Sequence, residues 1–328
     1  MIAHLAQNRV RRTYRGGARI DRLTGCAAPQ DEGMTRPEDW TASTVSAFNG
    51  SFEIAGEGLG RLVDGRLVKN VVGELPILVK LLDADERLVV QAHPTVSFAR
   101  VRLGSPVGKT ECWYFLPGTT ADACVYLGFK ERVTRVDWER AFDAWNYAPK
   151  ADESGNPILA NLHRVPVKPG DFVFVAGGLP HAIGAGCFMV ELQEPSDLMV
   201  VAERFTPSGR EIPTRKMDMG LGRTGMFDVY DYTGSSRDDL LARFVRRSQP
   251  AMDDGVRAVL GTDLTDKFAL WTLYGAAVLE MPRARAVVIV TDGNGLLNGV
   301  RVRKGDRLLL WDETRLVSSG SLRAVVCS

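Results

Sequence analysis

The sequence predicts a mainly β protein, built as two related barrels with short helical insertions. Three observations predict it: strands rich in β-branched and aromatic residues dominate, Gly, Pro and Asp separate them, and one turn-and-strand pattern occurs twice. Short strands at this spacing are typical of antiparallel sandwiches and barrels rather than of alternating βαβ units. The expected strands are 77–82, 88–92, 111–116, 172–175, 188–192, 286–290 and 307–311.

Two segments depart from the strand pattern and predict helices. Around 134–148 apolar residues recur every three or four positions, and Pro149 predicts the end of the helix. These apolar residues are Trp138, Ala141, Phe142 and Trp145. A second short amphipathic helix is expected at 238–245. Both helices are therefore expected as insertions into a β framework.

An internal repeat predicts the domain organisation. Lys-Pro-Gly-Asp-Phe-Val-Phe-Val at 168–175 is similar to Arg-Lys-Gly-Asp-Arg-Leu-Leu-Leu at 303–310, and each is a Gly-Asp turn before an apolar strand. We therefore expect an N-terminal barrel within 1–235, and a linker helix with a C-terminal barrel within 236–328. The segment 207–236, rich in Gly, Arg and Met, is expected to connect the barrels.

Composition favours a small-molecule partner. The chain has 328 residues, 41 basic and 40 acidic, and its net charge of +1 gives no electrostatic signature of nucleic-acid or membrane binding. Its five cysteines show no C-x-x-C spacing, so neither a disulfide framework nor a cysteine-rich metal site is expected. No signal peptide and no membrane-spanning run is found. We expect a cytoplasmic monomer or homodimer.

Four polar residues mark the ends of apolar strands and predict a site. Gln91 and His93 must project from the same face of their strand, because strand side chains alternate in direction. Glu111 and His181 lie at the ends of two other strands. A divalent metal would compensate the cost of burying such groups, and two imidazoles with a carboxylate suit zinc, iron or manganese. Ordinary hydrogen-bonded core histidines remain the alternative.

The motifs around these residues resemble those of the type I mannose-6-phosphate isomerases, in particular the short bacterial form. The resemblance spans 74–197, with motifs Val-Gln-Ala-His-Pro at 90–94, Gly-Lys-Thr-Glu-Cys-Trp-Tyr at 108–114, Pro-His-Ala-Ile-Gly at 180–184 and Glu-Leu-Gln-Glu-Pro-Ser-Asp at 191–197. It implies a double cupin, that is, two jelly-roll β-barrels. It also implies one Zn²⁺ per chain in the N-terminal cupin, held by Gln91, His93, Glu111 and His181.

The chain departs from this family at three places. Arg15 stands where the family usually has the Trp of Trp-Gly-Gly, and Val201 stands where many members carry a catalytic arginine. Arg204, three positions later, is predicted to replace that arginine. Leu316 lies where the second repeat would need a counterpart of His181, which predicts a metal-free C-terminal cupin.

The resemblance implies interconversion of mannose 6-phosphate and fructose 6-phosphate through a cis-enediol, with zinc as the Lewis acid. Glu191 and Asp197 are the candidates for the group that moves the proton. Lys109, two residues before Glu111 on the same strand face, is predicted to contact the substrate phosphate, with Arg204 and Lys80 as alternatives. A metal-dependent cupin oxygenase or epimerase and a non-enzymatic sugar-binding cupin remain alternative functions.

Overall fold

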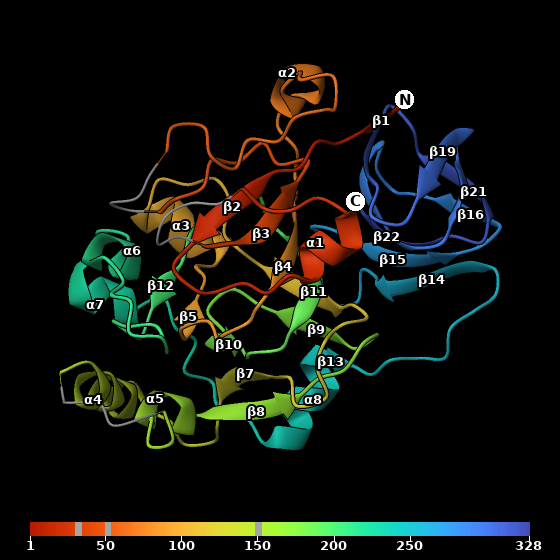
Figure 1. Ribbon diagram of the computed structural model, residues 1–328. Coiled ribbons are helices and arrows are strands. Elements are labelled where there is room, and N and C mark those ends of the chain that lie inside the picture. The colour runs from red at the N-terminus through yellow and green to blue at the C-terminus, as the bar shows by residue number, and fades with distance from the viewer. Residues whose placement is uncertain (30–34, 50–53, 148–152) are drawn as a thin grey trace.

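The structure, a computed structural model, describes residues 1–29, 35–49, 54–147 and 153–328 (Figure 1). Strands account for 35% of the chain and helices for 17%, so the predicted mainly β fold is confirmed. The strands form four sheets, which are grouped in two pairs. This arrangement is consistent with two jelly-roll barrels.

The first pair of sheets encloses a large apolar core, to which both sheets contribute buried side chains. Neighbouring strands in both sheets are antiparallel. The seven-stranded sheet has the order β13 (Val245–Arg246), β9 (Phe172–Val175), β6 (Glu111–Phe115), β11 (Phe188–Gln193), β4 (Leu78–Asp83), β3 (Thr35–Thr41) and β2 (Arg9–Arg12). The five-stranded sheet has the order β12 (Val200–Val201), β5 (Gln91–Ala92), β10 (His181–Ile183), β7 (Cys124–Phe129) and β8 (Leu162–Pro166).

The second pair of sheets forms the C-terminal barrel around a separate apolar core. Its six-stranded sheet has the order β1 (Ile2–His4), β20 (Arg307–Trp311), β17 (Arg285–Asp292), β22 (Arg323–Cys327), β15 (Leu270–Tyr274) and β14 (Gly255–Leu260). Its four-stranded sheet has the order β16 (Ala277–Glu280), β21 (Arg315–Gly320), β18 (Asn294–Leu297) and β19 (Val300–Arg303). Leu316 is fully buried in this core, as an apolar residue at that position should be.

Both predicted helices are present. α4 (Arg135–Asn146) begins with a capping box in which Thr134 and Asp137 bond each other's backbone, and α8 (Arg237–Phe244) is capped by Ser236. Pro149 lies outside the described residues. The sequence did not predict six further helices, because each is too short to show a periodicity: α1 (Arg19–Thr24), α2 (Val68–Val72), α3 (Val96–Arg102), α5 (Pro157–Ala160), α6 (Thr214–Asp218) and α7 (Gly222–Phe227).

Three elements cross the predicted division at residue 235. Strand β1, at the N-terminus, pairs with β20 and so belongs to the C-terminal barrel (Figure 1). Helix α8 and strand β13 follow residue 235 but belong to the first barrel, because Leu240 and Phe244 are buried in its core and β13 pairs with β9. The N-terminal strand therefore belongs to the second barrel, and the first barrel extends past residue 235 as far as β13.

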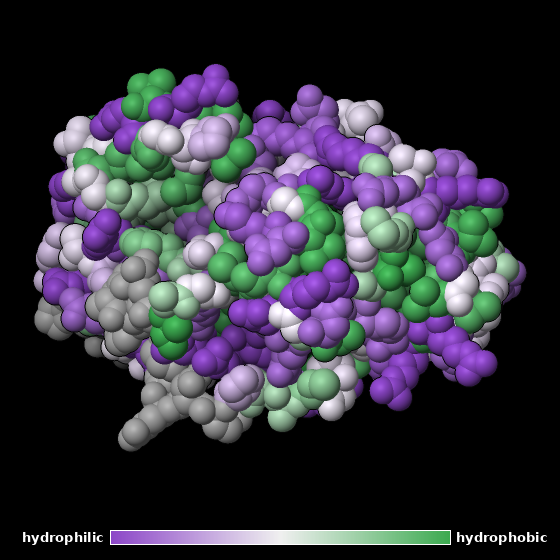
Figure 2. Space-filling view, turned by 90° about the horizontal axis from the view of Figure 1, so that it is seen from above, coloured by the Kyte–Doolittle hydropathy of each residue, from purple (hydrophilic) through white to green (hydrophobic). Residues whose placement is uncertain are grey.

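The surface mixes hydrophilic and hydrophobic residues. On the face shown in Figure 2, hydrophobic residues form separate patches among hydrophilic ones, as is normal for a globular protein. Among the described helices, none combines the length and the apolar composition that crossing a bilayer requires.

A buried ion pair joins the two barrels. Nη1 of Arg307, on β20, donates to Oδ2 of Asp39, on β3, over 2.5 Å, and both side chains are buried. Burial raises the pKa of Asp39, and the attraction of Arg307 opposes this shift without cancelling it. The ionised form of Asp39 therefore depends on Arg307.

We expect Arg307→Met to destabilise the protein by about 3–5 kcal/mol, because it leaves the Asp39 carboxylate buried without its ion-pair partner. Urea unfolding followed by circular dichroism measures the change. Arg301→Met, at an exposed position of the same barrel, is the control and should stay within about 0.5 kcal/mol of the native protein. Equal unfolding midpoints for the two variants would contradict the assignment.

Candidate metal centre

The predicted ligands come from three distant segments that meet in space. Gln91 begins β5, Glu111 begins β6 and His181 begins β10, while His93 follows β5 by one residue. His181 and Gln91 are direct partners in the antiparallel pairing of β10 with β5. Potential ligand atoms of His93, Glu111 and His181 all lie within 4.8 Å of one another, and the three side chains are fully buried. We refer to these three residues as the metal group.

Hydrogen bonds orient both imidazoles toward the carboxylate. Nδ1 of His93 lies 2.9 Å from the carbonyl oxygen of Leu198, and Nδ1 of His181 lies 2.9 Å from that of Leu179. A carbonyl oxygen only accepts, so each Nδ1 must carry the proton and each Nε2 keeps a free lone pair. These Nε2 atoms lie 3.1 Å and 3.5 Å from the carboxylate oxygens of Glu111. Backbone carbonyls commonly orient metal-binding histidines in this way.

The protonation states also suit a metal. Burial, reinforced by the neighbouring Lys109, lowers the pKa of His93, and burial with the neighbouring His93 lowers the pKa of His181 to about 3. Burial alone would raise the pKa of Glu111, but Lys109 and His93 outweigh it and hold that pKa well below its usual range. At neutral pH the group therefore offers two neutral imidazoles and one carboxylate, the forms that bind cations.

Two further predicted residues lie beside the metal group. The amide nitrogen of Gln91 is 3.3 Å from Nε2 of His181. Nζ of Lys109 is 2.7 Å from Nε2 of His93 and also contacts Oε2 of Glu111. Lys109 was predicted to contact a phosphate; its ammonium lies at the metal group, and the residue also lines the neighbouring recess. A cation beside these donors shows that the group accommodates positive charge.

A recess opens next to the metal group. Its lining includes Gln91 and Lys109 from the metal side. Buried charged residues of other strands and of helix α6 also line it, namely Arg12, Glu38, Lys80, Glu191 and Lys216. Buried charged groups with shifted pKa values cluster at functional sites, so this recess is the candidate active site.

An ion pair between adjacent strands lies in this recess. Lys80 and Glu191 are direct partners in the pairing of β4 with β11, and Nζ of Lys80 donates to Oε1 of Glu191 over 2.8 Å. Burial raises the pKa of Glu191, although Lys80 opposes the shift. Burial alone would lower the pKa of Lys80, but Glu191 and Glu38 outweigh it, and the pKa is raised. Glu191 therefore binds a proton more tightly than an ordinary glutamate does, even though it pairs with Lys80.

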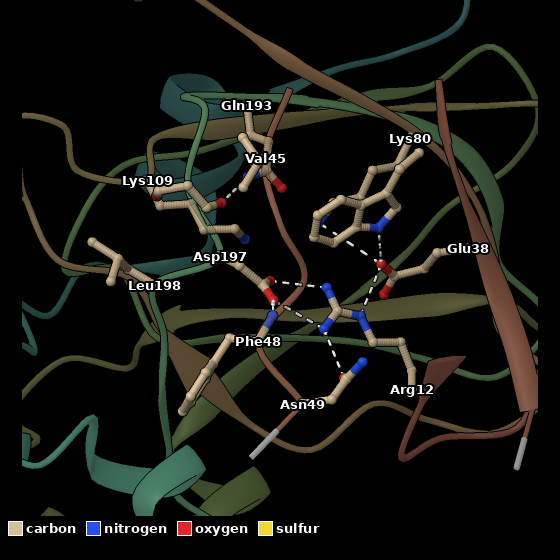
Figure 3. A network of polar contacts seen from close by, with 12 residues as sticks. Arg12, Glu38, Val45, Phe48, Asn49, Lys80, Lys109, Gln193, Asp197 and Leu198 are labelled. Atoms are coloured by element: carbon tan, nitrogen blue, oxygen red, sulfur yellow. Dashed lines mark hydrogen bonds and ion pairs between the residues drawn. The ribbon is translucent and has the colours of Figure 1, made fainter. Parts of the chain in front are cut away.

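Arg12, which lines the recess, connects two other carboxylates. Figure 3 shows its guanidinium between Glu38 and Asp197. Its Nε donates to Glu38 over 3.0 Å, and its two terminal nitrogens donate to the two oxygens of Asp197 over 2.9 Å and 3.0 Å. Burial would raise the pKa of both carboxyls, but Arg12 outweighs it, and the pKa of Glu38 falls to about 2. Asp197, predicted as a proton-transfer candidate, is therefore held as an ionised partner of Arg12.

The structure does not bring Arg204 to the recess. Its side chain is 45% exposed and pairs with Glu211 over 2.7 Å. Val201 is buried and lines the recess. Among the described residues, the arginine that lines the recess is Arg12, which the sequence analysis did not single out.

Sequence reasoning also missed Lys216 and Glu38. Glu38 belongs to Pro37-Glu-Asp-Trp40, where a carboxylate alternates with an indole along one strand face, and this alternation was a usable signal. Lys216 lies in the segment expected to be a connector, and nothing in its sequence neighbourhood distinguishes it from a solvated lysine.

Comparison with known proteins identifies relatives of the chain. It is 28% identical to a mannose-6-phosphate isomerase of Bacillus subtilis (strain 168) over 251 residues, which are 72% of this chain and 69% of the relative. It is also 28% identical to a mannose-6-phosphate isomerase of Streptococcus mutans over 242 residues, 72% of this chain and 68% of the relative. The chain is a homologue of the mannose-6-phosphate isomerases. The resemblance predicted from its motifs is thereby confirmed.

The fold agrees with this relationship. The crystal structure of the mannose 6-phosphate isomerase from Bacillus subtilis superposes with a TM-score of 0.70 at 19% identity, covering 100% of this chain and 99% of that one. No family model matches the chain. The kinship with mannose-6-phosphate isomerases therefore rests on the individual relatives and on the shared fold.

We expect the protein to bind about one divalent metal ion per chain, and His181→Gln to weaken this binding by at least about tenfold because one converging nitrogen donor is lost. Metal analysis after dialysis and calorimetric titration with Zn²⁺ measure both quantities. His163→Gln is the matched control, because Nε2 of His163 contacts the carbonyl oxygen of Ser235 and the residue is not part of the metal group. Equal zinc affinity in both variants would exclude the metal group as the site.

Proposed function

We propose that this protein is a zinc-dependent aldose–ketose isomerase that interconverts mannose 6-phosphate and fructose 6-phosphate. The observation that carries the proposal is that a buried group fit for a metal lies next to a recess that a buried lysine–glutamate pair lines. The names of the relatives support an isomerase acting on a sugar phosphate. The fold alone would not, because one fold hosts many reactions.

The donor set supports a divalent metal held by His93, Glu111 and His181, with the amide oxygen of Gln91 as a fourth ligand. Two imidazoles and a carboxylate suit zinc, which the motif resemblance also implies, and bound zinc would polarise the sugar carbonyl as a Lewis acid. Lys109, in contact with His93 and Glu111, would then stand beside the reacting oxygens as a hydrogen-bond donor.

We propose Glu191 as the group that moves the proton. Isomerisation of the aldose removes a proton from C2, passes through a cis-enediol and returns a proton to C1. The reverse reaction removes a proton from C1 of the ketose and returns one to C2. The burial that raises the pKa of Glu191 brings it closer to the working pH, which suits a general base. Lys80, on the neighbouring strand, orients the carboxylate of Glu191 by a hydrogen bond. Asp197 is less suited, because Arg12 and the backbone nitrogen of Phe48 occupy its oxygens.

The defining experiment is a coupled isomerase assay with metal analysis of the same preparation. We expect turnover of mannose 6-phosphate that a chelator abolishes and Zn²⁺ restores, because the metal would stabilise the charge developing on the enediol oxygens. Bound iron with oxygen consumption would point to a cupin oxygenase instead. Sugar-phosphate binding without turnover at saturating zinc would point to a sugar-binding cupin.

Glu191→Gln should lower kcat by about 10²–10⁴-fold, because the amide keeps the size of the side chain but cannot accept the proton. Zinc content should stay at the native level, since Glu191 is not one of the metal group. Glu139→Gln, on the outer part of helix α4, is the control and should keep native kcat. Native kcat in Glu191→Gln would remove Glu191 from the proposed reaction.

A further inference from the structure

Lys216 is a buried lysine contributed by the connector between the barrels. It lies in α6. Met217 of this helix and Ile212, which precedes the helix, are buried in the apolar cluster beside β12. These contacts fix the helix over the recess, and only 4% of Lys216 is exposed. Lys216 lines the recess together with Arg12, Gln91 and Lys109.

The ammonium of Lys216 lacks an anionic partner. Within the described parts of the chain, its Nζ makes one hydrogen bond, to Oδ1 of Asn49 over 3.3 Å, and it forms no ion pair. Asp197 attracts it, but the oxygens of Asp197 already accept bonds from Arg12 and from the backbone of Phe48. Burial, reinforced by Arg12, lowers the pKa of Lys216 to about 8. A buried ammonium without a carboxylate is costly to keep.

Lys80 shows that this cost comes from the missing partner. Lys80 is as buried as Lys216 and lines the same recess, but Glu191 lies 2.8 Å from its Nζ. Its pKa is accordingly raised, whereas that of Lys216 is lowered. The difference marks Lys216 as a cation that is ready for an anion from outside the protein.

A second cation lies next to Lys216. Oδ1 of Asn49 accepts from Nζ of Lys216 over 3.3 Å and from Nη1 of Arg12 over 3.2 Å, so one neutral oxygen separates the two positive groups. Two cations this close repel each other, as the downward effect of Arg12 on the pKa of Lys216 shows. An anion with several oxygens, such as a phosphate dianion, would be attracted to both.

The balance of charge in the recess leads to the same ligand. Four cations line the recess, and all except Lys216 contact carboxylates. The cations are Arg12, Lys80, Lys109 and Lys216. The carboxylates that they contact are Glu38, Asp197, Glu191 and Glu111. With neutral imidazoles, the formal charge of this set is zero. A bound divalent ion would leave two positive charges, which one phosphate dianion would neutralise.

We propose that Lys216, with Arg12 beside it, receives the phosphate group of the sugar phosphate, while the reacting carbons face the metal group. This inference rests on the proposed function for the identity of the substrate. A hexose 6-phosphate carries its phosphate at the far end of the carbon chain from C1 and C2. Among the described residues, Lys216 makes no hydrogen bond or ion pair with the metal group, so different side chains would hold the phosphate and the metal.

The test is the Lys216→Met variant, which keeps the length of the side chain and removes its charge. KM for mannose 6-phosphate should rise at least about tenfold, because a desolvated charge contact is lost. The value of kcat should stay within about threefold, because this contact is made equally in the ground state and the transition state. Lys216→Arg, which keeps the charge, should recover part of the affinity. Lys69→Met, at an exposed position of α2, should keep native KM.

Sorbitol 6-phosphate separates this inference from the proposed function, because it carries the phosphate but no carbonyl and cannot react. Calorimetry should show that zinc-loaded Lys216→Met binds it at least about tenfold more weakly than the native protein and Lys69→Met do. Weaker binding by the variant would support the phosphate site even if the native protein fails to isomerise mannose 6-phosphate. Equal binding by the native protein and Lys216→Met would overturn it even if the native protein is an active isomerase.

Dependence on pH provides a second readout. The charged groups that face Lys216 are Arg12, Asp197, Glu38 and Lys80. The free ammonium loses its proton as the pH rises through about 8, so kcat/KM of the native protein should fall there. The Lys216→Met variant should lack this component. A lysine whose pKa is lowered on folding destabilises the folded state at neutral pH, so the variant should unfold at no lower temperature than the native protein. An identical pH profile in both proteins would contradict the inference.

Discussion

The central constraint of this structure is the register of four neighbouring antiparallel strands, β3, β4, β11 and β6. Trp40 pairs with Lys80, Lys80 pairs with Glu191, and Glu191 pairs with Trp113, so these four side chains form one row across the sheet. Directly opposed residues of antiparallel strands project from the same face. A shift of one residue in any pairing would turn the lysine or the glutamate toward the opposite face. The register therefore places the ion pair in the recess and encloses it between two indoles.

The two tryptophans of this row also bind neighbouring carboxylates. Glu111 lies two residues before Trp113, so it shares the face of the row, and the indole nitrogen of Trp113 donates to Oε1 of Glu111 over 3.1 Å. Glu38 lies two residues before Trp40, and the indole nitrogen of Trp40 donates to Oε2 of Glu38 over 2.7 Å. Each tryptophan thus excludes water with its ring and satisfies a carboxylate with its N–H. This double use explains how a sheet can carry several buried carboxylates on one face.

Much of this arrangement could be predicted from the sequence, but only where the pattern is local. Gln91 and His93 alternate on one strand and Glu111 lies in a short motif, so their shared orientation follows from strand geometry. Arg12 and Lys216 could not be found in this way, because each reaches the recess through contacts with residues far away in the chain. Arg12 bonds Asp197, which is 185 positions away, and Lys216 bonds Asn49, which is 167 positions away. Arg204 was expected to reach the recess from β12, but that strand ends at Val201.

The C-terminal barrel contributes no member of the metal group, but it contacts the residue next to Glu111. Nζ of Lys267 lies 3.1 Å from Oγ1 of Thr110 and 2.6 Å from Oε2 of Glu194, and the same glutamate oxygen accepts from the backbone nitrogen of Thr110. Thr110 stands between Lys109 and Glu111, so this network holds the backbone from which both side chains project. Orientation of ligands by residues that do not touch the metal is a general requirement of metal sites. We therefore infer that the second barrel stabilises the backbone next to Glu111 from outside, which gives this barrel a structural role in the site.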